Sequence, residues 1–135
     1  MRTLGLRMAK SAETSLLLAE RLASHPGVGH VIHPGRADHP DYALFMRDFK
    51  APAGLFAVNF PDWNLKRSER FLDALTIFGL GFSWGGFESL AIHCDPQLRR
   101  QHGERRKGAL IRFAIGLEDV DDLWEDIQQA INASA

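Results

Sequence analysis

Residues 109–131 have the sequence ALIRFAIGLEDVDDLWEDIQQAI, and this stretch decides the fold of the chain. Side chains alternate between the two faces of a strand, so residues 109–115 place Arg112 opposite the bulky Ile111 and Phe113. In residues 120–131 the apolar side chains recur every three or four positions, and acidic residues occupy the positive N-terminal end. The chain is therefore predicted to end in a strand followed by an amphipathic helix.

The rest of the chain alternates between short helical and extended patterns. Apolar periodicity and the bounding prolines and glycines predict helices at 3–24, 40–49 and 64–76, and strands at 28–32, 54–60 and 90–93. Residues 96–107 are polar and basic, which indicates a short helix or a loop at the surface. With brief connections and no repeat or linker, the pattern predicts a single α/β domain made of one sheet and a helical layer.

Composition bounds the class of protein. A chain of 135 residues with 45% hydrophobic residues is long enough for one domain with a sizeable core. Its 16 basic and 17 acidic residues give no electrostatic basis for binding nucleic acid or an anionic membrane. The single cysteine, Cys94, indicates a reducing compartment, so we expect a cytoplasmic protein. No segment approaches the roughly 18 apolar residues of a membrane span, and the N-terminus lacks a signal-peptide pattern.

Arg112 is the first candidate for a binding residue. A guanidinium offers a planar fork that binds a carboxylate through two hydrogen bonds, and a strand holds it more rigidly than a loop does. The alternatives are a salt bridge to Glu88 or Glu118, or an arginine that simply faces solvent. Spacing alone leaves these alternatives open.

Ser83 and Trp84 lie in a segment with four glycines between Gly79 and Gly86, which indicates backbone that bends sharply or approaches another group closely. The serine and the indole N–H could line a polar pocket. The alternative is a tight turn with a packing tryptophan. The glycine spacing does not match a dinucleotide or phosphate-loop motif.

Other chemically capable residues are interpreted as structural. His30 and His33 are expected to point to opposite faces of a strand end, which disfavours a metal site. His93 and Cys94 are adjacent on a strand and diverge for the same reason, so a nucleophilic pair is not predicted. The basic clusters within 99–107 lack interleaved aromatic residues and are interpreted as a solvated face.

Several segments together resemble the C-terminal domain of the Cys/Met-metabolism pyridoxal-phosphate enzymes. These segments are RTL at 2–4, GLF at 54–56, SWGGFESL at 83–90, LIR at 110–112 and GLEDVDDL at 116–123. The resemblance covers essentially the whole chain and implies the α+β fold of the small domain of fold type I enzymes, with a mainly antiparallel sheet covered by helices. Residues 1–135 would form a substrate-carboxylate-binding domain, and residues 1–24 a helix at the domain junction. Trp84 resembles cystathionine β-lyase, because the γ-synthase and γ-lyase branches usually carry leucine there.

The resemblance also implies roles for residues. Arg112 matches the arginine that binds the substrate α-carboxylate, and Ser83 and Trp84 match the segment that completes this pocket. Binding the carboxylate would orient the amino acid for reaction at its α-carbon. The acidic residues of 118–122 belong to the family motif and are interpreted as helix-start and surface structure.

The cofactor implied by the resemblance is pyridoxal 5′-phosphate, held in the family by a lysine of a separate, larger domain. The sequence offers only Lys10, Lys50, Lys66 and Lys107, none in the Ser/Thr-rich context of that lysine, and its one tyrosine is Tyr42. We therefore expect the chain to catalyse no C–S cleavage alone. Its expected partners are an amino-acid substrate and either the missing cofactor domain or a family homo-oligomer.

Two further functions stay open at this point. The first is a fragment of a cystathionine γ-lyase, a γ-synthase or a cysteine-S-conjugate β-lyase. The second belongs to a different class, a non-enzymatic domain that binds a small carboxylate or docks on a family member. The coding sequence immediately upstream of Met1 would distinguish an enzyme fragment from such an independent module.

Overall fold

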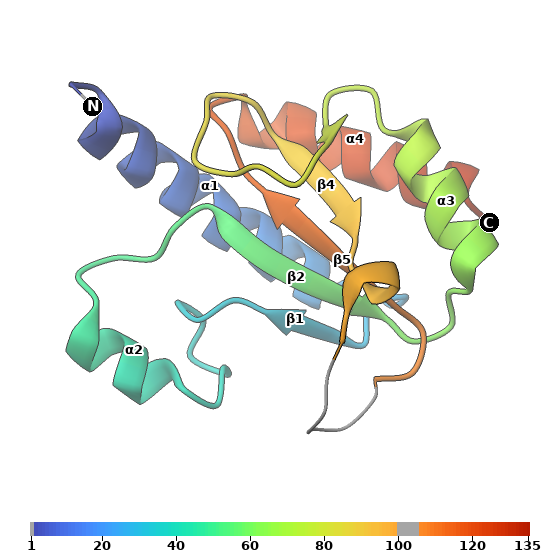
Figure 1. The fold of residues 1–135 in the computed structure, drawn as a ribbon, viewed down its shortest axis with the longest axis horizontal. Coiled ribbons are helices and arrows are strands. Elements are labelled where there is room, and N and C mark those ends of the chain that lie inside the picture. Colours follow the sequence, from blue (N-terminus) through green and yellow to red (C-terminus); the bar gives the residue numbers. More distant parts are fainter. Residues whose placement is uncertain (1, 100–105) are drawn as a thin grey trace.

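The computed structural model describes residues 2–99 and 106–135, which form a single five-stranded sheet with helices packed against it (Figure 1). The helices are α1 (Leu4–Ala23), α2 (Tyr42–Asp48), α3 (Leu65–Ala74) and α4 (Val120–Ala133), with a 3₁₀ turn, η1, at Asp95–Gln97. The strands are β1 (His30–Ile32), β2 (Leu55–Phe60), β3 (Gly79–Leu80), β4 (Leu90–His93) and β5 (Ala109–Ala114). The predicted α+β class, a mainly antiparallel sheet covered by helices, is confirmed.

The sheet is built around β5, which pairs antiparallel with β2 on one side and with β4 on the other. The full strand order is β1-β2-β5-β4-β3. In this register Arg112 lies between Ala57 and Ile92, so the three side chains share one face of the sheet. The outermost pair, β3 with β4, is parallel.

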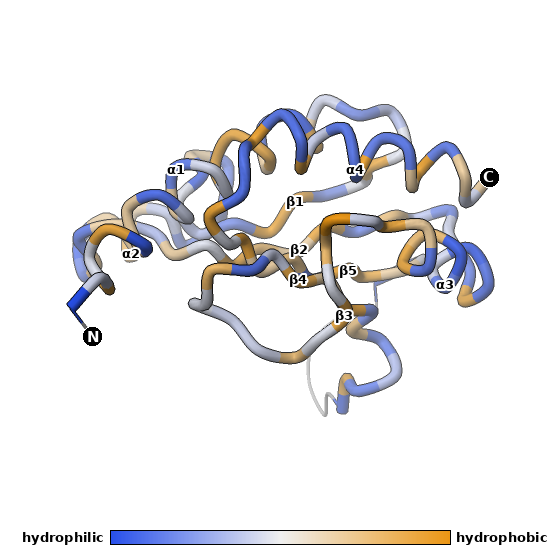
Figure 2. Tube along the Cα trace, turned by 90° about the horizontal axis from the view of Figure 1, so that it is seen from above, coloured by the Kyte–Doolittle hydropathy of each residue, from blue (hydrophilic) through white to orange (hydrophobic). Residues whose placement is uncertain are grey.

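One face of the sheet carries the hydrophobic core. Figure 1 shows α1 and α4 crossing behind the strands, and Figure 2 shows both helices on one side with the loop between β3 and β4 on the other. Phe113, fully buried on β5, lies within 5.3 Å of the Phe56 ring and 5.4 Å of the Phe78 ring, measured between centroids. Such aromatic pairs add specific geometry to the burial of large apolar surfaces. The alternation predicted for residues 109–115 is confirmed.

The terminal helix α4 is fixed at its start by local and long-range contacts. Asp119 caps it by accepting a hydrogen bond from the Asp121 N–H at 2.8 Å. Asp121 in turn pairs with Arg21 of α1 at 2.7 Å, and the Arg21 guanidinium lies 5.9 Å from the Trp124 ring centroid. The helix-start role predicted for these acidic residues is confirmed for Asp119.

The remaining predictions differ from the structure in particular places. Strand β1 is shorter than the predicted 28–32, and β3 was not expected from the sequence, whereas η1 lies at the start of the segment predicted as a short helix or a loop. Part of the predicted surface segment 96–107, residues 100–105, lies outside the described residues, whereas Arg99, Arg106 and Lys107 are exposed as expected. Within the described residues no helix is long and apolar enough to cross a membrane. Over 2–99 and 106–135, no three potential metal ligands cluster.

His33 is the most buried histidine among the described residues, and it belongs to a hydrogen-bond network beneath α1. Its Nδ1 accepts from the Gly35 N–H at 3.0 Å, so Nε2 carries the proton and donates to the Ser15 hydroxyl at 3.0 Å. The Ser15 hydroxyl lies 2.9 Å from the Ala12 carbonyl oxygen, to which it donates. Burial lowers the pKa of His33 from 6.5 to about 4, and the charge of Arg36 acts in the same direction.

We predict that acid destabilises the fold through His33. Its folded-state pKa lies below the value in an unfolded chain, so unfolding takes up a proton once the pH falls below 6.5. The stability present above pH 6.5 should therefore decrease as the pH approaches 4, by up to about 3 kcal/mol. Urea unfolding at several pH values measures this slope.

His25 provides a matched control. Its Nδ1 also accepts a hydrogen bond from the N–H of the residue two positions later, Gly27, but its ring is only half-buried. His33→Gln should flatten the slope between pH 6.5 and 4, and His25→Gln should leave it unchanged. Equal slopes in the wild type and His33→Gln would contradict the assignment.

Candidate functional site

The candidate site lies on the face of the sheet opposite the helices. Arg112 extends from the middle of β5 onto this face, while its neighbours Ile111 and Phe113 are fully buried on the other. The backbone on both sides of Arg112 is held by antiparallel ladders to β2 and β4. A guanidinium on such a central strand has a fixed base, which suits it to orient a ligand.

The structure brings the three predicted site residues together. The Arg112 Nη2 group donates to the carbonyl oxygens of Gly81 and Ser83, each at 3.2 Å. The Arg112 Cζ atom lies 5.9 Å from the centroid of the Trp84 ring, within the range of a cation–π contact. Over the described residues Arg112 makes no ion pair, so the alternative of a salt bridge to Glu88 or Glu118 is not what the structure shows.

Two of the three guanidinium nitrogens of Arg112, Nε and Nη1, donate no hydrogen bond within the described residues. Its Nε atom is buried and has no hydrogen-bond partner within the described residues. A buried donor without an acceptor costs roughly 1–3 kcal/mol, and hydrogen bonds from a charged donor are stronger than neutral ones. The guanidinium therefore retains binding capacity after its two contacts to the loop, and an anionic oxygen is the acceptor that matches it best.

The loop over Arg112, residues 81–89, is strongly exposed and apolar at its tip. Phe82, Trp84 and Phe87 have exposed fractions of 62%, 63% and 73%. Gly85 has a φ of 75°, a left-handed conformation that a side chain would strain. The sequence prediction of a sharply bent segment is confirmed, whereas packing of the indole into the core is not observed.

Glu118 has a contact that sequence reasoning missed. It was interpreted as part of the helix start and surface, but its Oε1 and Oε2 accept from the Ser89 N–H and the Ser89 hydroxyl, both at 2.7 Å. The Ser89 hydroxyl also accepts from the Gly116 N–H at 2.9 Å. The only signal in the sequence was a serine at the end of this glycine-rich segment.

The described residues do not provide a place where pyridoxal phosphate is attached. All four lysines are exposed, and Lys10 and Lys107 pair with Glu13 and Asp62 at the surface. A covalently bound cofactor requires a lysine sheltered in a pocket, with donors for the phosphate. The chain's own lysines therefore do not fit this group.

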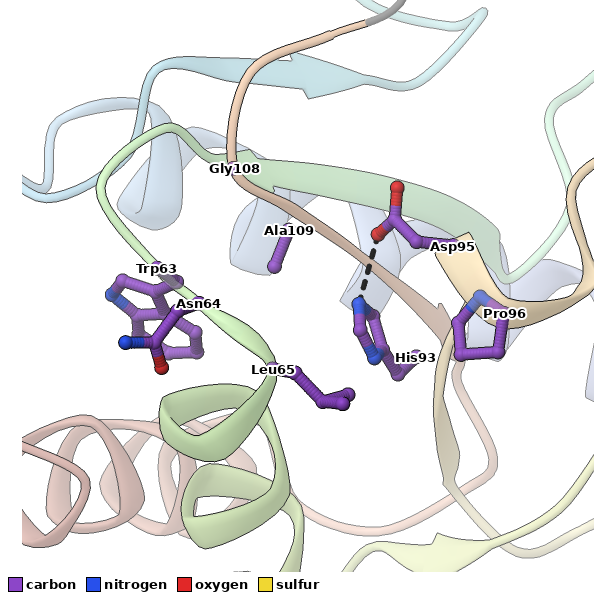
Figure 3. A pocket seen from close by; sticks show the side chains of 8 residues that line it. All are labelled: Trp63, Asn64, Leu65, His93, Asp95, Pro96, Gly108 and Ala109. Carbon is purple, nitrogen blue, oxygen red and sulfur yellow. Dashed lines mark ion pairs between the residues drawn. The ribbon is translucent and has the colours of Figure 1, made fainter.

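A hollow of about 370 Å³ lies at the Ala109 end of β5 (Figure 3). Its lining residues are Trp63, Asn64, Leu65, His93, Asp95, Pro96, Gly108 and Ala109, which include no lysine or arginine to hold a phosphate. In Figure 3 the His93 ring points toward Asp95, and its Nε2 lies 2.9 Å from the carboxylate. Asp95 also accepts from the Leu110 N–H at 2.7 Å, which fixes the turn after β4.

The thiol of Cys94, beside this hollow in sequence, is half-buried, and burial raises its pKa. A raised pKa keeps the thiol protonated and poorly nucleophilic. The sequence interpretation of Cys94 as a structural thiol agrees with this environment.

Comparison with known proteins identifies the family. The family model for Cys/Met metabolism PLP-dependent enzymes matches residues 1–132. The chain belongs to this family. Among its relatives, a putative cystathionine beta-lyase of Rhizobium johnstonii is 41% identical over all of this chain and 35% of its own length. The cystathionine beta-lyase of Escherichia coli is 40% identical, over 94% of this chain and 33% of its own length.

Relatives with γ-lyase names are similar at nearly the same level. An L-methionine gamma-lyase of Pseudomonas deceptionensis is 37% identical over all of this chain and 35% of its own length. The crystal structure of an apo methionine gamma lyase from Micromonospora echinospora superimposes with a TM-score of 0.83 and 35% identity, over 96% of this chain and 35% of that one. The chain thus spans about a third of the length of the PLP-dependent lyases it matches.

Proposed function

We propose that this chain forms the substrate-carboxylate side of the active site of a PLP-dependent carbon–sulfur lyase of the cystathionine β-lyase type. Arg112 would bind the α-carboxylate of the amino acid, and Ser83 and Trp84 would complete the pocket around it. The whole reaction would convert cystathionine to homocysteine, pyruvate and ammonia. The observation that carries this proposal is the strand-borne guanidinium of Arg112, with a donor to spare, directly under the Ser83-Trp84 segment.

The physical argument concerns orientation. A carboxylate bound through two charge-assisted hydrogen bonds has a defined plane, and a guanidinium fixed on β5 passes that orientation to the rest of the substrate. The open face of the sheet around Arg112 carries apolar neighbours, including Ala57 and Ile92, which lower the local polarity and strengthen an ionic contact.

The cofactor lysine would come from outside these residues. The four lysines of the chain do not fit the role, and the lyases it resembles continue over a length that this chain does not match. We propose that a cofactor-binding domain or a family partner covers the exposed tip of the loop. The exposure of Phe82, Trp84 and Phe87 supports such a partner, since contiguous apolar surface usually marks an interaction site.

We predict that the chain binds an amino-acid carboxylate through Arg112. L-alanine should shift the NMR signals of the Arg112 Nε–H and the Trp84 indole, whereas L-alaninamide, which lacks the carboxylate, should not. Arg112→Lys should weaken binding roughly 10- to 100-fold, because it removes the planar fork.

Arg67→Lys is the matched control for this measurement. Arg67 also lies over a tryptophan, with its guanidinium 5.0 Å from the Trp63 ring centroid, but it belongs to α3. Its replacement should leave the L-alanine affinity unchanged. Equal binding of L-alanine and L-alaninamide would reject the carboxylate site and favour a docking module.

We further predict that the purified chain forms no specific lysine adduct with pyridoxal phosphate and releases no pyruvate from cystathionine. Borohydride reduction followed by peptide mass spectrometry should find only partial labelling, spread over the exposed lysines. Stoichiometric labelling of one lysine together with pyruvate release would contradict the proposal.

A γ-lyase is the second candidate, and the similarity to methionine γ-lyases is the observation that favours it. Trp84 argues for β-elimination, because the resemblance associates leucine at this position with γ-chemistry. In a chain completed with a cofactor domain, Trp84→Leu should shift the ratio of kcat/KM values from cystathionine β-cleavage toward γ-substituted amino acids. An unchanged ratio would leave the branch assignment without support.

A further inference from the structure

We propose that Glu118 and Asp126 are positioning residues of the carboxylate site, which hold the two ends of the loop so that Ser83 and Trp84 lie over Arg112. Neither side chain is in hydrogen-bond contact with Arg112, so each acts through the loop. That the loop shapes a carboxylate site rests on the proposed function. That Glu118 and Asp126 hold the loop in place does not depend on it.

Asp126 holds the entrance to the loop. It lies on α4 with 3% exposure, and its Oδ1 accepts from the N–H and the hydroxyl of Thr76, both at 2.8 Å. Its Oδ2 accepts from the Ile77 N–H at 2.8 Å and the Phe78 N–H at 3.1 Å. The Gln129 amide donates to Oδ1 at 3.0 Å. Three successive backbone N–H groups are thus fixed on one carboxylate, immediately before β3.

Charge makes this anchor effective. Burial alone would raise the pKa of Asp126, but the hydrogen bonds from Thr76, Ile77 and Phe78 prevail and hold it below its ordinary value. The carboxylate is therefore ionised at neutral pH and accepts stronger hydrogen bonds than a neutral group would. No cation pairs with it among the described residues, so the backbone of 76–78 is its main partner.

Glu118 holds the exit from the loop through Ser89, as described above. The Leu117 N–H adds a bond to the Phe87 carbonyl oxygen at 2.9 Å. Gly116 permits this close approach, because a Cβ atom there would collide with the Phe87 carbonyl oxygen and the Glu88 backbone. The loop therefore returns to the sheet against residues 116–118, and no residue larger than glycine fits at position 116.

Besides the two anchors, the ends of the loop are held by the pairing of β3 with β4 and by the Gly79 N–H, which donates to the Ser89 carbonyl oxygen at 3.0 Å. Residues 82–88 are exposed, and within the described residues this stretch contacts Arg112, through the Ser83 carbonyl oxygen and the Trp84 ring, and Leu117, through the Phe87 carbonyl oxygen. Burial therefore contributes little to the position of Ser83. Arg112, Glu118 and Asp126 all come from β5 and the segment that continues into α4, so the guanidinium and both anchors are fixed relative to one another.

The test compares Glu118→Gln and Asp126→Asn with Glu125→Gln, which neutralises an exposed carboxylate next to Asp126 in sequence. The full chain is labelled with 5-fluorotryptophan, and its three ¹⁹F signals are assigned with the single variants Trp84→Phe and Trp63→Phe. In both anchor variants the Trp84 signal should move and change width, while the Trp63 signal stays in place. Affinity for L-alanine should fall roughly fivefold to tenfold, and Glu125→Gln should match the wild type in every respect.

Folding defects are separated by milder variants. If Asp126→Asn unfolds the chain, Thr76→Val removes only the hydroxyl contact to Asp126. Ser89→Ala removes the hydroxyl contact to Glu118 together with the acceptor of the Gly116 N–H, and keeps the Ser89 N–H bond to Glu118. These variants should again move the Trp84 signal and leave the Trp63 signal. Unchanged Trp84 signals and L-alanine affinity in folded anchor variants would overturn the inference.

The same experiment distinguishes the inference from the proposed function. A Trp84 signal that responds to the anchor variants in a protein that does not bind L-alanine would reject the carboxylate site and retain the anchors. L-alanine binding that is weakened by Arg112→Lys and unaffected by both anchor variants would retain the site and reject the anchors.

Discussion

The pairing of β5 between β2 and β4 is the constraint on which the rest of the structure depends. A strand with neighbours on both sides has fixed faces, because slipping by one residue would move every side chain to the opposite face. Phe113 and Ile111 are therefore committed to the core, and Arg112 to the open face. The core and the candidate site both follow from the alternation of side chains along β5, so a change in the register of this strand would disturb both.

The loop over Arg112 illustrates how a polar site can be built without burying the chain that forms it. Backbone N–H groups at both ends are bonded to the carboxylates of Asp126 and Glu118. Carboxylates satisfied by several N–H donors avoid the entropy cost of ordering a second long side chain, which a salt bridge would require. The aromatic tip of the loop is thus left exposed.

The sequence predicted most of the framework and only part of the site. The period of three and four in 120–131 and the alternation in 109–115 depend on local side-chain order, which is visible along one chain. The hydrogen bonds that join Arg112, Glu118 and Asp126 to residues 76–89 connect positions 29 to 50 apart, and no local pattern encodes such a distance. Strand β3 was missed because it has only two residues, one of them glycine, and so has no period to recognise.

The parallel pairing of β3 with β4 has a consequence for sequence change over time. Gly79 pairs with Leu90 and Leu80 pairs with Ala91. Both ends of the loop between β3 and β4 are therefore fixed at the same edge of the sheet. An extra residue in this loop would cost little stability, because the entropic cost of closing a loop grows slowly with its length. It would nevertheless carry the Gly81 and Ser83 carbonyl oxygens away from Arg112. An insertion here should therefore disturb the contacts of the loop with Arg112 more than it disturbs the fold.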